Sequence, residues 1–224
     1  MQVADLAAAP LTVSEARHTA VDFTVPYMSF GLEILMKKPR AGNKNTPDSS
    51  LPTISSVKDL ARQTDIKYGV IAGGRTEDFF RRSKDEDYKL MWREMNSNRG
   101  FGLVPSNLEG VRLVNESDGR YAFILEGPTA KYWAQKQPCD MVSVEGGADN
   151  RHYALAVRRG SPLKEKLDDA LKQMDNGGEL DKLYQKWWIE RSECGRAADR
   201  FIGAGWSLVI ALLTALMVAA FPLL

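Results

Sequence analysis

Three short segments of this 224-residue sequence place charged or anion-binding groups where they would act on a small ligand. Arg17 follows "AAPLTVSEA", and its planar guanidinium can hold a carboxylate through two parallel hydrogen bonds, which a lysine cannot do. "GGRTEDFF" predicts a helix that begins near Thr76, whose hydroxyl and free backbone N–H groups suit an anion. Glu126 closes the apolar segment "YAFILE" and, if buried, needs a cation such as an ammonium group.

Each of these residues also has a purely structural interpretation. Arg17 is compatible with a surface salt bridge, Thr76 with a simple helix N-cap, and Glu126 with the point where a strand reaches the surface. Taken together, however, a guanidinium, a helix-terminus anion site and a carboxylate complement two carboxylates and one ammonium group. The set therefore predicts an acidic amino acid as the ligand.

The composition excludes some classes of partner. Hydrophobic residues make up 44% of the sequence, which suits one large or two small globular lobes. The 30 basic residues nearly balance the 29 acidic residues, for a formal charge of +1. This charge leaves no large basic field, so nucleic acid is not an expected partner.

Strands and helices alternate along the chain, which favours an α/β fold with a parallel or mixed sheet. The predicted strands are "IKYGVIAGG", "RYAFILEG" and "RHYALAVRRGSP". The predicted helices are "SSVKDLARQTD", "RTEDFFRRS", "NLEGVRLVNESDG", "TAKYWAQKQ", "LKEKLDDALKQMDNGG" and "ELDKLYQKWWIE", the last two separated by Gly177 and Gly178. In open α/β sheets, ligands bind beyond the carboxyl ends of strands and beside helix N-termini, where the candidate residues fall.

The C-terminal segment differs from the rest of the chain. It contains no charged residue from Phe201 to Leu224. A helix of this length would measure roughly 36 Å, longer than a bilayer core of about 30 Å, so a transmembrane helix is predicted over residues 199–224. Arg196 and Arg200 favour a cytoplasmic side before it, and the N-terminal "MQVADLAAAP" has no signal-peptide pattern.

The remaining reactive residues do not indicate an enzyme. Cys139 and Cys194 lie in no CxxC or Cys/His cluster, and they are compatible with free thiols or, in an oxidising compartment, with a pair. His18 and His152 accompany no nucleophile or metal cluster, and no dinucleotide or phosphate-loop glycine motif is present. The expected protein is not an enzyme and binds no metal or cofactor. Asn115 begins a glycosylation acceptor, "NES".

Five segments together resemble the ligand-binding core of ionotropic glutamate receptors, nearest the kainate and AMPA branch, followed by their last membrane helix. The matching segments are "ADLAAAPLTVSEARHTAVDFTVPYMSFGLEILMKKP", "VKDLARQTDIKYGVIAGGRTEDFFRRSK", "YAFILEGPTAKYW", "GGADNRHYALAVRRGSPL" and "GELDKLYQKWW". The resemblance implies a periplasmic-binding-protein-like clamshell of two lobes, with lobe 1 incomplete. It divides the chain into a lobe 1 remnant (1–29), a crossover strand and linker (30–56), lobe 2 (57–148), a return to lobe 1 with a pre-membrane segment (149–198), and the transmembrane helix (199–224).

The resemblance also implies roles for individual residues. The ammonium group of L-glutamate would meet the Pro10 carbonyl and Glu126, and the α-carboxylate would meet Thr12 and Arg17. The γ-carboxylate would meet Thr76 at the start of its helix, and Tyr153 would support Glu126. Cys139 and Cys194 would form a disulfide in an extracellular domain.

The sequence departs from the family in three ways. Arg75 replaces a small residue, so its cation would either pair with the γ-carboxylate or obstruct it. Gly127 and Pro128 replace a more polar pair. The opening part of lobe 1 is absent, and "RAGNKNTPDSSLPTI" stands in place of three pore segments.

The resemblance therefore implies the ligand-binding part of a glutamate-gated channel subunit at the plasma membrane, in contact with lipid and, in a full-length form, with other subunits of a tetramer. The chain alone is not expected to conduct ions. The alternatives are a membrane-anchored amino-acid-binding module and a non-functional receptor fragment.

Overall fold

The computed structural model describes residues 4–38 and 52–194 of the chain. The strands in this part form a seven-stranded sheet with the order β1-β7-β3-β6-β4-β5, and β2 pairs with β7 at the side. The strands are β1 (Leu6–Thr12), β2 (Val21–Phe23), β3 (Met28–Lys37), β4 (Lys67–Ile71), β5 (Leu103–Val104), β6 (Tyr121–Glu126) and β7 (Met141–Arg158). Strands β4, β5 and β6 are parallel, whereas the other pairs are antiparallel, so the predicted α/β fold with a mixed sheet is confirmed.

The described helices lie between and after these strands. They are α1 (Glu15–His18), α2 (Val57–Ala61), α3 (Arg75–Arg82), α4 (Glu86–Ser97), α5 (Arg99–Gly102), α6 (Asn107–Glu116), α7 (Gly127–Ala134), α8 (Leu163–Asn176) and α9 (Glu179–Tyr184), which continues as a π-helix (Gln185–Glu190). All six predicted helices are present, and α8 stops at Gly177 as the glycine pair predicts. Helix α4 is not among the predicted helices, although Tyr88, Met91 and Met95 are buried along one of its faces.

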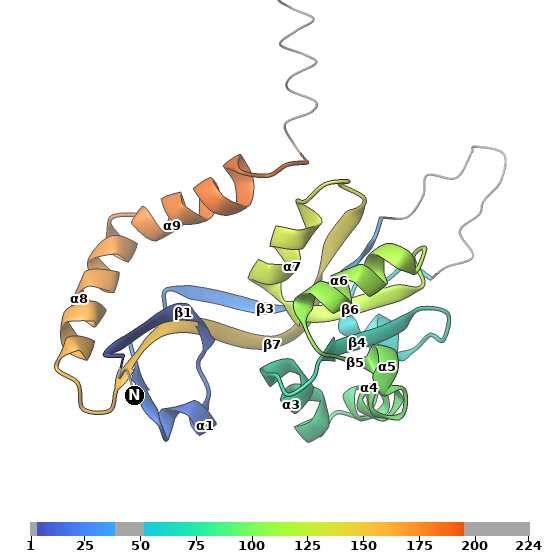
Figure 1. Cartoon of the computed structure of the whole chain (residues 1–224), viewed down its shortest axis with the longest axis horizontal. Helices are drawn as coiled ribbons and strands as arrows, with labels where there is room; N and C mark the ends of the chain where they lie inside the picture. Colours follow the sequence, from blue (N-terminus) through green and yellow to red (C-terminus); the bar gives the residue numbers. More distant parts are fainter. Residues whose placement is uncertain (1–3, 39–51, 195–224) are drawn as a thin grey trace, which may run out of the picture.

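A long antiparallel ribbon of β3 and β7 joins the two ends of the molecule (Figure 1). At one end it carries β1, β2 and α1, and at the other end β6, β4 and β5 continue the sheet. The ribbon is irregular near its middle, where the register shifts between Phe30 and Glu33. On β7, Gly147 adopts φ +65°, in the left-handed region that glycine tolerates best.

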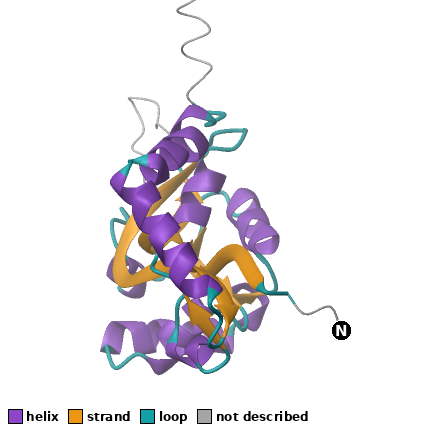
Figure 2. Ribbon diagram, turned by 90° about the vertical axis from the view of Figure 1, so that its left-hand side faces the viewer, coloured by secondary structure: helices purple, strands orange, loops and turns teal. Residues whose placement is uncertain are grey.

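The larger core surrounds the β6 end of the sheet and has two sides. On one side, Ile124 and Ile34 pack with residues of α2, α3 and α4, among them Val57, Phe80 and Met91. On the other side, β6 and β3 pack against α6 and α7. The buried cluster there consists of Leu35, Val104, Val111, Val114, Tyr121, Phe123, Leu125, Ala130 and Met141. Figure 2 shows strands enclosed by helices in this way. Because β6 is covered on both faces, its sequence "YAFIL" is apolar throughout.

The β1 end of the sheet has much less core. Its buried cluster consists of Phe23, Ala154 and Ala156, with Leu11, Val13 and Val21 partly buried against it. Most of β1 is exposed, and only Thr12 at its end is buried. Strand β1 is therefore held mainly by its backbone pairing with β7, and burial of a hydrophobic face contributes little.

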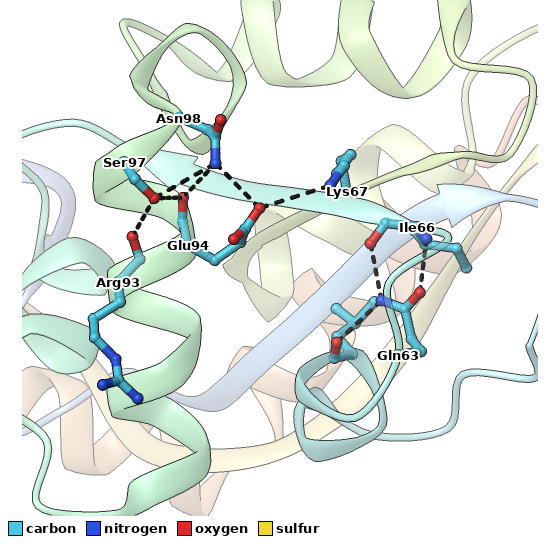
Figure 3. Close-up of polar contacts among 8 residues, drawn as sticks. Gln63, Ile66, Lys67, Arg93, Glu94, Ser97 and Asn98 are labelled. Atoms are coloured by element: carbon cyan, nitrogen blue, oxygen red, sulfur yellow. Dashed lines mark hydrogen bonds and ion pairs between the residues drawn. The ribbon is translucent and has the colours of Figure 1, made fainter.

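A glutamine side chain closes the turn between α2 and β4. The Gln63 amide donates to the carbonyls of Leu60 and Ile66 and accepts from the Ile66 N–H, so it substitutes for three backbone hydrogen bonds (Figure 3). Further along, Lys67 of β4 lies 3.7 Å from Glu94 of α4. These contacts fix the start of β4, whose far end leads directly into α3.

Gly69 of β4 occupies a position without room for a side chain. A Cβ atom there would overlap the Phe101 carbonyl oxygen and the Tyr121 hydroxyl, which are hydrogen-bonded to each other. We expect Gly69→Ala to lower the free energy of unfolding by about 3 kcal/mol, as overpacking against backbone does. The measurement is urea unfolding. Gly100→Ala in α5 is the matched control, because its Cβ would meet no atom within 4 Å, and an equal loss in both variants would contradict the prediction.

The predicted transmembrane helix at 199–224 lies outside the described residues. Within residues 4–38 and 52–194, no helix is both long and apolar enough to cross a bilayer.

Candidate functional site

A cavity of about 190 Å³ lies between the part of the molecule that contains β1 and α1 and the part that contains β4, β6 and α3. Its walls are formed by residues from β1, α1, β4, α3, α6, β6 and α7. Of the seven residues predicted to bind the ligand, all except Tyr153 line this cavity: Pro10, Thr12, Arg17, Arg75, Thr76 and Glu126. The structure therefore brings together side chains that are more than a hundred residues apart in the sequence.

Arg17 is held at the mouth of this cavity by local structure. Ser14 caps α1, and its hydroxyl accepts a hydrogen bond from the Arg17 N–H at 3.4 Å. The Arg17 side chain then turns back, and Nη1 donates to the Thr12 carbonyl at 2.7 Å. A guanidinium has five N–H donors, so this single bond fixes its position and leaves donors for a carboxylate.

Glu126 is the last residue of β6 and accepts hydrogen bonds from residues of β1 and β7. The Thr12 hydroxyl donates to Oε1 at 2.6 Å, and the Tyr153 hydroxyl donates to Oε2 at 2.5 Å. Arg151 Nη1 approaches Oε1 at 3.4 Å. The Glu126 side chain is 21% exposed, so it keeps an open edge for a cation from the cavity.

Arg151 is the site residue that the sequence analysis does not identify. Its side chain is only 2% exposed, and Nη1 also donates to the Thr76 hydroxyl at 3.0 Å. Nε donates to Asp149 at 2.7 Å, which offsets the buried charge. Its position two residues before Tyr153 on β7 was the available signal, because residues i and i+2 share a face of a strand.

Thr76 does not act as the N-cap of its helix. Helix α3 begins at Arg75, and Gly74 is the cap residue without a side-chain hydrogen bond. The buried Thr76 hydroxyl instead accepts from Arg151, so the simple N-cap interpretation of this threonine is wrong. Its position in the first turn places it on the cavity wall beside free backbone N–H groups.

Tyr153 lies beneath Glu126 and is 4% exposed. Burial, together with the charge of Glu126, raises the pKa of Tyr153 well above its usual range. The phenol therefore stays protonated and remains a hydrogen-bond donor to the carboxylate. Phe30 packs on the Tyr153 ring, with the ring centroids 4.2 Å apart.

A larger cavity of about 720 Å³ lies along β3 and β7 beside α7 and α9. It contains none of the predicted ligand residues. The charged residues that line it are mainly acidic, among them Glu33, Glu145 and Asp181, and they include one cation, Lys131. The buried Glu33 pairs with Lys131 at 3.2 Å and accepts from Ser143. The donor set expected for an acidic amino acid is therefore found only in the smaller of these two cavities.

The remaining sequence predictions concern residues away from the cavity. Cys139 and Cys194 form the predicted disulfide, with their Cα atoms 5.4 Å apart. His18 is exposed beside Phe23, and Nδ1 of His152 lies 2.9 Å from the Ser29 hydroxyl. Asn115 is exposed near the end of α6.

The mixed α/β fold and the charged cavity are those expected of a solute-binding domain. The sequence matches the family of bacterial extracellular solute-binding proteins, family 3, over residues 2–190, and the chain belongs to this family. It is also similar to "Glutamate receptor 3" of Homo sapiens and of Mus musculus, with 39% identity over 150 residues in each case. These matches confirm the resemblance to glutamate receptors. They cover 67% of the chain but only 17% of each relative, so the chain spans about a sixth of the length of the curated relatives that it matches.

Proposed function

We propose that this chain is the ligand-binding portion of a glutamate-gated cation channel subunit, and that it binds L-glutamate in the 190 Å³ cavity. The observation that carries the proposal is the charge pattern of that cavity. Arg17 and Glu126 face it from opposite ends of the molecule, as the α-carboxylate and ammonium group of one amino acid would require. The likeness to glutamate receptors supports the same ligand.

The residue roles follow from this arrangement. Arg17 holds the α-carboxylate together with the Thr12 amide and with the Thr12 hydroxyl, whose single proton turns from Glu126 to the ligand on binding. Glu126 holds the ammonium group with the Pro10 carbonyl. Thr76 and the first N–H groups of α3 receive the distal carboxylate. Arg151 and Tyr153 do not line the cavity, and they act by orienting Glu126 and Thr76.

The proposed domain organisation is a clamshell with an incomplete lobe 1. Residues 1–29 and 149–198 form the lobe 1 part, residues 57–148 form lobe 2, and residues 30–56 connect them. Residues 199–224 form a transmembrane helix that holds the binding domain on the extracellular side of the plasma membrane, with Asn115 glycosylated. In a longer form, the subunit assembles with others into a tetramer.

The chain by itself is proposed not to conduct ions. Between the end of β3 at Lys37 and the start of α2 at Val57, the connection is about as long as a single membrane-spanning helix, which needs about 20 residues. It has no room for three pore segments. This observation favours the second candidate function, a membrane-anchored amino-acid-binding module, for the chain expressed alone.

Isothermal titration calorimetry tests the proposed ligand. The full 224-residue chain, purified in a mild detergent, is expected to bind L-glutamate with a stoichiometry of one, and binding is expected to raise its melting temperature. Absence of both heat and thermal stabilisation would identify a non-functional fragment. Glutamate-evoked current from the chain expressed alone would contradict the non-conducting assignment.

A further inference from the structure

Arg75, the first residue of α3, lines the 190 Å³ cavity, and its side chain makes no hydrogen bond or ion pair with residues 4–38 and 52–194. Its Nε atom is shielded from solvent and makes no hydrogen bond, and no ion pair to its guanidinium is found among residues 4–38 and 52–194. A guanidinium that is partly removed from water normally gains such a partner, so this position is suited to an anion from outside the chain.

The acids nearest to Arg75 in sequence are engaged elsewhere. Glu77 accepts a hydrogen bond from the Gly73 N–H at 2.5 Å, and it lies 4.0 Å from Arg81. Asp78 pairs with Arg81 and, at 3.9 Å, with Arg82. Helix α3 therefore pairs its acids with its own last-turn arginines. Asp78 lies within electrostatic range of Arg75 but makes no ion pair with it, so no carboxylate of α3 occupies the guanidinium.

The ionisable residues that line the cavity are two cations and one anion, Arg17, Arg75 and Glu126. Next to them, Arg151 contacts Glu126 and is itself paired with Asp149, so this inner pair adds little net charge. An amino acid with a neutral side chain would compensate Arg17 and Glu126 and leave Arg75 uncompensated. An amino acid with an acidic side chain supplies one charge for each of the three.

We infer that Arg75 determines the specificity of this site, because it pairs with the distal acid of the ligand and selects acidic amino acids over their neutral amides. The inference rests on the proposed function and adds to it the group that discriminates between ligands. A distal carboxylate bound only by Thr76 and backbone N–H groups would be held by dipoles, whereas the Arg75 guanidinium supplies a full charge in a fork that matches the carboxylate. Specificity then arises from both attraction and rejection, since a neutral amide leaves a cation unpaired.

The test is a cycle of two ligands and two proteins, with L-glutamate and L-glutamine titrated into the wild-type chain and into Arg75→Gln. Arg75→Gln is expected to weaken glutamate binding by about 30-fold and to change glutamine binding by less than about 3-fold. Arg82→Gln, on the same helix with a side chain that is 76% exposed, is the matched control and is expected to change neither affinity. Melting temperatures of the unliganded proteins identify any variant that fails to fold.

Arg75→Ser tests whether Arg75 pairs with the distal carboxylate of the ligand or obstructs it, because this variant removes both the charge and the bulk of the side chain. Pairing predicts weaker glutamate binding in this variant too. Tighter glutamate binding in Arg75→Ser, or equal losses for glutamate and glutamine in Arg75→Gln, would overturn the inference while leaving the proposed function intact. If the wild-type chain binds no glutamate, the proposed function fails and the inference fails with it.

Discussion

Replacing Arg17 by lysine is expected to weaken the binding of L-glutamate by at least about 100-fold, although the positive charge is kept. The reason is geometric. Nη1 of Arg17 is used in the hydrogen bond to the Thr12 carbonyl, and the rest of the guanidinium fork is available for the α-carboxylate. A lysine ammonium is a single point, so it cannot hold the carbonyl and present a planar pair of donors at the same time.

Arg159→Lys is the matched control for this experiment. Arg159 Nη1 also donates to a carbonyl near α1, that of Thr19 at 3.2 Å, but Arg159 does not line the cavity. Calorimetry should therefore detect normal glutamate binding in Arg159→Lys and little or none in Arg17→Lys. Comparable affinity for L-glutamate in the two variants would show that Arg17 does not bind the ligand carboxylate.

Removal of the disulfide is expected to lower the free energy of unfolding by about 4 kcal/mol in the chain-entropy model. Cys139 follows α7, and its partner Cys194 is 55 residues further along, so the bond closes a long loop of the unfolded chain. The double variant Cys139→Ala/Cys194→Ala should unfold at a lower urea concentration than the oxidised wild-type chain.

Reductant provides the control for this prediction. Dithiothreitol should shift the unfolding midpoint of the wild-type chain towards that of the double variant and leave the double variant unchanged. Local contacts also hold the segment, since Lys136 lies 2.5 Å from Glu193 and the Trp188 indole donates to the Pro128 carbonyl at 2.8 Å. Equal unfolding midpoints for the oxidised wild-type chain and the double variant would contradict the prediction, because they would show that the disulfide does not restrict the unfolded chain.

The parts of the fold with strong local patterns could be predicted from the sequence. "YAFIL" is buried along its whole length, and α8 ends at the glycines that follow it, as expected. Strand β1 carries no such pattern, because "LAAAPLT" is mostly exposed and becomes a strand only by pairing with β7. The π-helical continuation of α9 likewise has no local sequence signal.

The same distinction applies to the candidate site. Arg17 and Glu126 could be identified because their charges complement a ligand, whatever their surroundings. Asp149 is a neighbour of Arg151 on β7, but the role of Arg151 also depends on Thr76, which reaches it only after α3 has packed beside the sheet. Contacts between side chains 75 residues apart are set by tertiary structure and cannot be obtained from spacing.

A register shift in the β3–β7 ribbon lies between Glu126 and the two residues that donate hydrogen bonds to it. Tyr153 pairs with Met28 on one side of the shift between Phe30 and Leu32, and Thr12 pairs with Tyr153, whereas Glu126 pairs with Leu32 on the other side of this shift. A rotation of the β1 part relative to the β6 part about this shift would therefore lengthen the hydrogen bonds from Thr12 and Tyr153 to the Glu126 carboxylate. If Glu126 binds the ligand ammonium as proposed, the same carboxylate would both hold the ligand and link the two parts of the molecule on either side of the shift.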